Sequence, residues 1–181
     1  VVVRVVGGPD DAATWTLSLR VPSWARGATV EVAGEARPAE PGYIRIRRRF
    51  APGDVVRLHL PVAPRFTWPH PQIDAVRGCV AVERGPEVLC VESVDVPEVS
   101  HVDELRVDTS VPPRDDGDGV VVRAVALDLG RAAGVPADGA LPYYDRPAEP
   151  ARTRALDVRL TPYHDWANRG PSTMRVWLPT A

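Results

Sequence analysis

The segment from Thr161 to Pro171 holds the densest set of side chains that could bind or transform a ligand. Within seven residues it brings together aromatic, acidic, amide and cationic groups: Tyr163, His164, Asp165, Trp166, Asn168 and Arg169. Sugar-binding sites use this combination, because a ring covers the C–H face of a sugar while polar groups bond to its hydroxyls. The same composition suits a tight corner between domains, with Trp166 filling a cleft and Arg169 holding backbone carbonyls. The residues alone leave both roles open and favour the corner.

Four carboxylates could take part in glycoside hydrolysis, which needs two acids at a fixed separation. They are Glu83, Asp103, Glu104 and Asp165. Nothing in their spacing sets two of them face to face, and structural or solvated acids are the common case. The chain also lacks a G-x-S-x-G nucleophile motif, a phosphate-binding loop and the G-x-G-x-x-G motif. We therefore assign no catalytic residue to this sequence.

The acidic run ending at Gly119 resembles the middle of a calcium-binding loop. Aligning Gly119 with the loop's invariant glycine places Arg114 at the first ligand position and Val125 where a bidentate Glu belongs. An EF-hand is therefore excluded. An exposed acidic turn is the better interpretation, and an irregular calcium site is the alternative.

Two cysteines, Cys79 and Cys90, lie on either side of a Gly85-Pro86 turn. If the flanking runs form a hairpin, the thiols could approach each other, but a disulfide requires a register that the sequence does not give. No further His or Cys lies near enough in sequence to complete the four ligands of a zinc site. We expect two small buried side chains and assign no metal ligand.

The elements that position these groups have the period of β-strands almost everywhere. From Thr14 to Val21, apolar residues alternate with polar ones, and the pattern recurs around 30–32, 44–47 and 56–60. This alternation is typical of half-buried strands. Further apolar runs follow at 78–83, 88–92, 120–129, 154–160 and 174–178.

No window of the sequence shows a convincing helical stripe, and 20 prolines fall mostly between the apolar runs. Many short strands separated by turn signals predict an all-β protein. We expect two consecutive antiparallel β-sandwich (jelly-roll-like) domains with little or no helix. The first spans residues 1–92 and the loop-rich second spans 93–181, with long loops at 108–119 and 130–153.

Composition limits the partners. All 22 basic residues are Arg, which indicates a GC-rich genome, so the excess of Arg need not reflect phosphate binding; the net charge is −2. Acids and arginines alternate along the chain, so neither nucleic acid nor an anionic membrane is expected as the main partner. The chain opens in the middle of a strand pattern, so we expect a piece of a longer protein. A bacterial source is expected, and the compartment stays open with the cytoplasm favoured.

Several motifs, taken in order, resemble one family. They are Leu19–Ala25, Gly42–Ile46, Phe50–Val56, Leu60–Val62, Val80–Glu92, Pro162–Gly170 and Met174–Leu178. In this order and spacing they resemble the C-terminal, non-catalytic part of the β-L-arabinofuranosidase enzymes of glycoside hydrolase family 127. The resemblance spans nearly the whole chain and is weakest over residues 100–153.

The resemblance implies that a parent enzyme carries its chemistry in an N-terminal (α/α)6 barrel, followed by two β-sandwich domains that this chain matches. In that family a zinc-ligating Cys is the nucleophile and a Glu is the acid/base, and both lie in the barrel. Cys79 and Cys90 match no motif of that zinc site. We therefore expect the chain to be inactive alone and to hold no cofactor, with zinc belonging to the catalytic domain.

Two roles remain for such domains. In the first, they brace the catalytic barrel and contribute to a homodimer, with Trp24, Trp166 and Arg169 facing another domain or a packed loop. In the second, they form a carbohydrate-binding module for arabinose-containing glycans, with Trp68 and Trp166 as platforms and Asn168 as a polar contact. The expected partners are the catalytic barrel, a second copy or a glycan.

Overall fold

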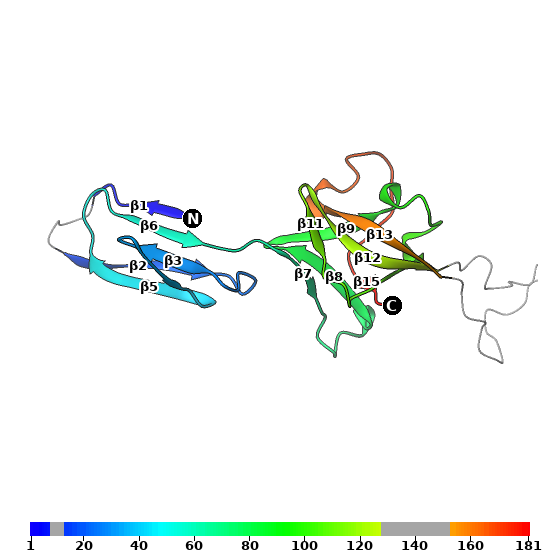
Figure 1. Ribbon diagram of the computed structural model, residues 1–181, viewed down its shortest axis with the longest axis horizontal. Helices are drawn as coiled ribbons and strands as arrows, with labels where there is room; N and C mark the ends of the chain where they lie inside the picture. Colours follow the sequence, from blue (N-terminus) through cyan, green and yellow to red (C-terminus); the bar gives the residue numbers. More distant parts are fainter. Residues whose placement is uncertain (8–12, 128–152) are drawn as a thin grey trace, which may run out of the picture. The chain divides into compact units, whose positions relative to one another are not determined.

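The computed structural model describes residues 1–7, 13–127 and 153–181, and it divides the chain into two compact units, Val1–Ala63 and Pro64–Ala181 (Figure 1). Strands dominate both units. In the described ranges the helical elements are four 3-10 turns of three residues each. The predicted all-β class is therefore confirmed. None of these turns has the length or apolarity that a membrane crossing requires.

The units divide between Ala63 and Pro64, whereas the boundary expected from the sequence lay after residue 92. Two strands explain the difference: β8 (Cys79–Arg84) and β9 (Glu87–Glu92). They pair with β15 (Leu178–Pro179) and β13 (Thr153–Pro162), which come from the end of the chain. These long-range pairings place residues 64–92 in the second unit. No local sequence pattern predicts which distant strands will pair.

The first unit contains two antiparallel sheets. The larger has the order β1 (Val2–Arg4), β6 (Val55–His59), β3 (Thr29–Val32) and β4 (Glu35–Pro38). The smaller pairs β2 (Thr14–Val21) with β5 (Gly42–Arg49) over eight residues. Apolar positions of both sheets form one core, which includes the buried Val30, Ile46, Phe50, Val56 and Leu58.

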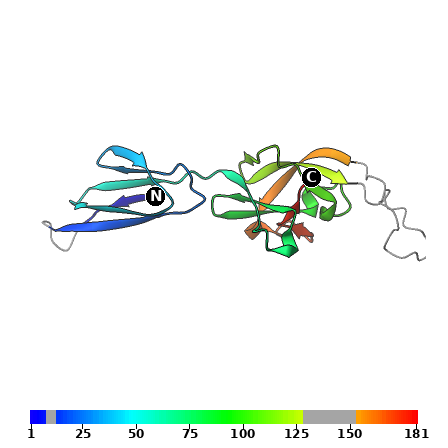
Figure 2. The same cartoon turned by 90° about the horizontal axis from the view of Figure 1, so that it is seen from below.

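The second unit is built on one nine-stranded sheet. Its main path runs β10 (Leu105–Val107), β12 (Gly119–Leu127), β13, β9, β8 and β15; β11 (Arg114–Asp116), β14 (Met174–Arg175) and β7 (Pro64–Thr67) pair beside it. A parallel bridge between Val107 and Thr180 joins the two ends of this path. The sheet therefore closes on itself, and its strands curve around a common interior in both views (Figures 1 and 2). Closure leaves fewer unpaired strand edges.

The interior of the second unit is filled by inward-facing residues from all around the sheet. Its largest fully buried side chains are Leu89, Leu105, Leu160 and Leu178. One close approach limits side-chain size, because a Cβ on Gly119 would lie 2.6 Å from the carbonyl oxygen of Leu160. Of the expected long loops, residues 108–119 contain the short strand β11, and most of 130–153 lies outside the described residues.

Candidate functional site

The segment after β13 turns sharply and returns along the second unit. Pro162 ends the strand, and a 3-10 turn, η4 (Tyr163–Asp165), follows. The amides of Trp166 and Asn168 donate to the carbonyls of Tyr163 and Asp165, at 3.2 and 3.3 Å. Ala167 has a φ of +64°, a left-handed conformation that is uncommon for a residue with a side chain. Other contacts must hold this backbone in place.

The contact that holds it is the buried carboxylate of Glu92, which is fully inaccessible at the end of β9. Glu92 accepts hydrogen bonds from the backbone N–H of Ala167 at 2.8 Å and from the Ser172 hydroxyl at 2.9 Å. The guanidinium of Arg169 donates a third. Burial alone would raise the pKa of Glu92, but these hydrogen bonds outweigh it and lower the pKa. Glu92 is therefore an ionised anchor inside the unit.

Arg169 links this anchor to two more groups. Its two terminal nitrogens donate to both carboxylate oxygens of Asp95, at 2.6 and 2.7 Å, and one of them lies 3.3 Å from the Thr161 hydroxyl. Paired donation of this kind is the strong geometry for a guanidinium and a carboxylate. The bonds to Asp95, and then to Glu92, raise the pKa of Arg169.

The segment around Arg169 does form a corner, but this corner differs from the expected one in three respects. Arg169 binds the carboxylates of Glu92 and Asp95, where backbone carbonyls were expected. All of these residues belong to the second unit, so the corner lies within one unit. Trp166 keeps 40% of its surface exposed and does not fill a buried cleft.

The exposed face of the corner carries an aromatic pair. The rings of Tyr163 and Trp166 stack with centroids 6.2 Å apart and planes 24° from parallel. A nearby open depression of about 280 Å³ is lined in part by Asp118, Arg159, Asp165 and Asn168. Exposed rings beside acid, amide and guanidinium groups have the composition of a sugar-binding surface.

The other two tryptophans named from the sequence lie elsewhere. Trp68 follows β7 and is 57% exposed, and within the described residues it stacks on no other ring. Trp24 lies in a turn of the first unit and packs, partly buried, against that unit's own core. The structure therefore brings together Trp166, Asn168 and Arg169, and neither of the other two joins them in a described contact.

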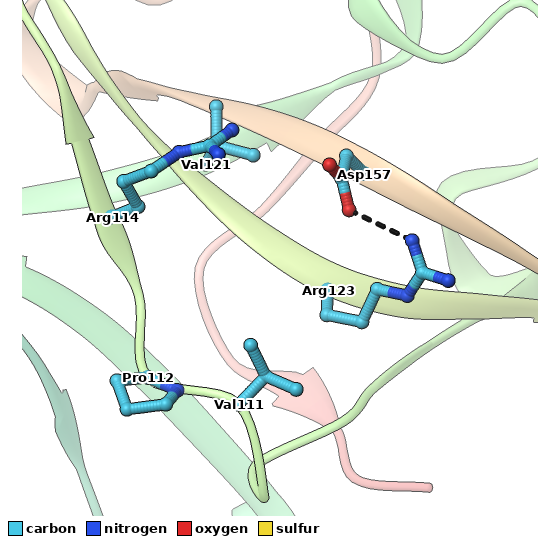
Figure 3. Close-up of a pocket in the computed structure, with 6 residues that line it drawn as sticks. All are labelled: Val111, Pro112, Arg114, Val121, Arg123 and Asp157. Carbon is cyan, nitrogen blue, oxygen red and sulfur yellow. Dashed lines mark hydrogen bonds and ion pairs between the residues drawn. The ribbon is translucent and has the colours of Figure 1, made fainter.

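A second open depression, of about 330 Å³, lies where the β11 region meets β12 and β13 (Figure 3). Its lining combines apolar and charged side chains: Val111, Pro112, Arg114, Val121, Arg123 and Asp157. Arg123 donates to Asp157 at 3.1 Å, as the dashed line in Figure 3 marks. An anionic ligand would have to compete with Asp157 for this cation.

The candidate carboxylates each contact a different partner. Glu83 bonds to Arg65 and to the Thr67 hydroxyl. Asp103 pairs with Arg175. Glu104 accepts from the amide of Ser100 at 3.1 Å, and Asp165 lies 3.5 Å from His164. These contacts give the four acids local structural roles.

The acidic run before Gly119 is the turn of the β11–β12 hairpin, and a guanidinium lies against it. Arg84 donates to Asp115 at 3.2 Å, to the Gly117 carbonyl at 2.5 Å and to Glu87 at 3.0 Å. Its pKa is raised, first by the bond to Glu87. A protein cation thus lies against this acidic turn. In the parts of the chain that the structure describes, no group of three His, Cys, Asp or Glu could hold a metal ion.

The two cysteines are buried and free. Cys79 lies opposite Pro179 on β15, while Cys90 lies opposite Thr161 on β13. The strands on either side of the Gly85-Pro86 turn pair as a hairpin, yet the two thiols stay free. Burial, together with the charge of Glu92, raises the pKa of the Cys90 thiol to about 11. Cys90 is therefore a protonated, unreactive side chain at neutral pH.

Sequence reasoning missed Glu92 and Asp95, and it gave Tyr163 no role of its own. The only signal for Glu92 was an acid at the end of a continuous apolar run, where a charge is buried only if it is paired. Tyr163 lay inside the aromatic segment, but its stacking on Trp166 depends on the turn between them.

The fold defines two consecutive β-domains built almost entirely from antiparallel strand pairs. Two family models match them. One, described as the β-L-arabinofuranosidase GH127 middle domain, covers residues 2–62, and the other, the glycoside hydrolase family 127 C-terminal domain, covers 64–179. The chain therefore belongs to glycoside hydrolase family 127.

The relatives that this chain resembles are consistent with this family assignment. A non-reducing end β-L-arabinofuranosidase of Bifidobacterium longum subsp. longum is 31% identical over 170 residues, covering 88% of this chain. A crystal structure of a GH127 β-L-arabinofuranosidase from Geobacillus stearothermophilus T6 is 31% identical over 93% of the chain, with a TM-score of 0.75. A structure described as a glycoside hydrolase is 29% identical over 99%, with a TM-score of 0.76. The chain spans 25%, 27% and 30% of these proteins.

Proposed function

We propose that this chain is the non-catalytic β-domain portion of a β-L-arabinofuranosidase-like glycoside hydrolase, and that it braces a catalytic (α/α)6 barrel. The observation that carries the proposal is the coincidence of the two compact units with the two family models, which divide at the same place. The named β-L-arabinofuranosidases are about four times longer than the part this chain matches. The remaining length of such an enzyme has room for the barrel.

The first unit has a flank suited to such bracing. Its two-stranded sheet and its four-stranded sheet share one core. Three residues of β2 point inward yet stay only half-buried: Trp15, Leu17 and Leu19. Partly exposed apolar side chains in a row gain about 25 cal/mol for each Å² that another surface covers. We also propose that these domains contribute to a homodimer. Light scattering of the full-length enzyme that contains this chain would measure its oligomeric state.

Hydrolysis of p-nitrophenyl β-L-arabinofuranoside tests the non-catalytic role. We expect no turnover by this chain alone at concentrations where the Bifidobacterium enzyme hydrolyses the substrate readily. Turnover by the chain itself, retained after gel filtration and unchanged by a chelator, would contradict the proposal. The search for catalytic groups would then return to Glu83 and Asp165.

The stacked pair Tyr163 and Trp166 supports a second candidate function, binding of an arabinose-containing glycan on the exposed face of the corner. Its test is titration of the chain with an arabino-oligosaccharide followed by tryptophan fluorescence. Trp166→Ala should abolish binding and leave the fold intact, because Glu92 holds the corner through Ala167, Arg169 and Ser172. Trp68→Ala is the matched control. Equal binding by all three proteins would reject this site.

A further inference from the structure

The outer face of the smaller sheet in the first unit carries a row of arginines. Side chains alternate along β5, so its outward positions are Tyr43, Arg45, Arg47 and Arg49, all exposed. The facing outward positions of β2 are Arg20, Ser18, Thr16 and Thr14, in register with them. Arg20 lies opposite Tyr43. The face therefore has four guanidinium groups, three hydroxyls and one phenol ring.

No acid stands at any outward position of these two strands. Three of the four arginines, Arg20, Arg45 and Arg47, differ from many other arginines in the described ranges, which are paired with acids. Nine form ion pairs with Asp or Glu, among them Arg57, Arg84 and Arg169. Within the ranges that the structure describes, Arg20, Arg45 and Arg47 form none. An Arg-rich genome explains why these cations are Arg, but it does not explain why they share one face without acids.

The strand geometry places the guanidinium groups of this row at regular intervals. Outward residues on one strand are about 6.8 Å apart, since each residue rises about 3.4 Å. Like charges at this separation repel, and the repulsion is relieved when an anion lies between them. A guanidinium also binds a carboxylate through two parallel hydrogen bonds. The facing hydroxyls of Thr16 and Ser18 add short hydrogen-bonding groups at the same level.

We propose that the outer face of β2 and β5 binds an acidic glycan, with uronate carboxylates on Arg45 and Arg47 and a sugar ring on Tyr43. The choice of a glycan rests on the proposed function, because the family acts on glycosides. A nucleic acid is disfavoured, because the chain as a whole has a net charge of −2. A single exposed tyrosine at the end of the row suits one sugar ring.

The test is isothermal titration of the whole chain with a de-esterified oligogalacturonate of about ten residues. The comparison ligands are its methyl-esterified form, which is neutral, and a single-stranded oligodeoxynucleotide of equal charge. The test variant is Arg45→Thr/Arg47→Thr, which keeps strand-forming residues on β5. The matched control, Arg37→Thr/Arg114→Thr, removes two exposed arginines from elsewhere. Thermal unfolding of both variants verifies that they fold.

We expect the acidic glycan to bind the wild type and the control equally. Binding by the test variant should be weaker by on the order of tenfold, the scale of two exposed ion pairs. Binding should weaken with added NaCl and be absent for the methyl-esterified form. Tighter binding of the oligodeoxynucleotide, equal losses in both variants, or no binding by the wild type would overturn the proposal. None of these results bears on catalysis, so the bracing role stands or falls separately.

Discussion

The buried carboxylate of Glu92 and the guanidinium of Arg169 form an ion pair across 77 residues of sequence. Glu92 ends a strand in the interior of the second unit, and Arg169 lies in the turn that carries the stacked aromatic rings. The pair therefore fixes an exposed surface to a closed core. A buried charge that loses its partner is costly, and this sets the first prediction.

Arg169→Ala should destabilise the chain by about 2–3 kcal/mol, because it leaves Glu92 buried without its cation while the exposure of Arg169 to solvent reduces the loss. The matched control is Arg123→Ala, which removes an exposed pair with Asp157 and should cost less than about 1 kcal/mol. Urea unfolding of the three proteins measures both effects. Equal losses of unfolding free energy in the two variants would show that the Glu92–Arg169 pair stabilises the chain no more than an exposed ion pair does.

The stability of the chain should depend on pH through Glu92. Its pKa in the folded protein lies below the ordinary value of 4.5. The carboxylate therefore contributes stability above about pH 4.5, and this contribution is lost as the pH falls through the folded pKa. Unfolding curves of the wild type and Glu92→Gln at several pH values between 7 and 3 test this. The variant should be less stable at pH 7, and the difference between the two should narrow toward pH 3. A difference in unfolding free energy that stays constant from pH 7 to pH 3 would contradict this role of Glu92.

Both thiols should resist modification in the folded chain. Cys90 is fully buried with a pKa of about 11, and Cys79 is 8% exposed. A thiol reagent such as DTNB should label neither residue at pH 8 in native buffer and both in denaturant, without prior reduction. Recovery of fewer than two thiols from the unfolded chain would indicate a disulfide and contradict the structure.

Gly119→Ala should destabilise the second unit by about 1–3 kcal/mol, the usual effect of overpacking. The new Cβ would lie 2.6 Å from the carbonyl oxygen of Leu160, and this backbone atom cannot rotate away. Gly7→Ala is a suitable control, because nothing lies within 4 Å of its added Cβ. We expect the control to change stability by less than about 0.5 kcal/mol. A tolerated Gly119→Ala would mean that β12 and β13 lie farther apart than the structure shows.

Local patterns predicted the longer strands well. The alternation in β2 and β5 appears directly in their burial, and the Gly85-Pro86 turn joins two paired strands. The short strands β7, β10 and β11 were not predicted, because three or four residues are too few to show a period. Proline at the start of β7 and beside β11 also reads as a loop signal.

Only part of the site around Trp166 and Arg169 could be predicted from the sequence. Its aromatic and polar residues are adjacent along the chain, so the segment itself stood out. Its anchor did not, because Glu92 and Arg169 meet only after the sheet of the second unit has formed. The same reason explains the misplaced domain boundary: the strands up to residue 92 find their partners near the C-terminus.

The most direct test of the bracing role uses three versions of the Bifidobacterium enzyme: intact, truncated to remove the part that this chain matches, and with that part replaced by this chain. The readouts are hydrolysis of p-nitrophenyl β-L-arabinofuranoside and the thermal midpoint. Truncation should abolish activity and lower the midpoint, and the replacement should restore both in large part. A truncated enzyme as active and stable as the intact one would contradict the bracing role.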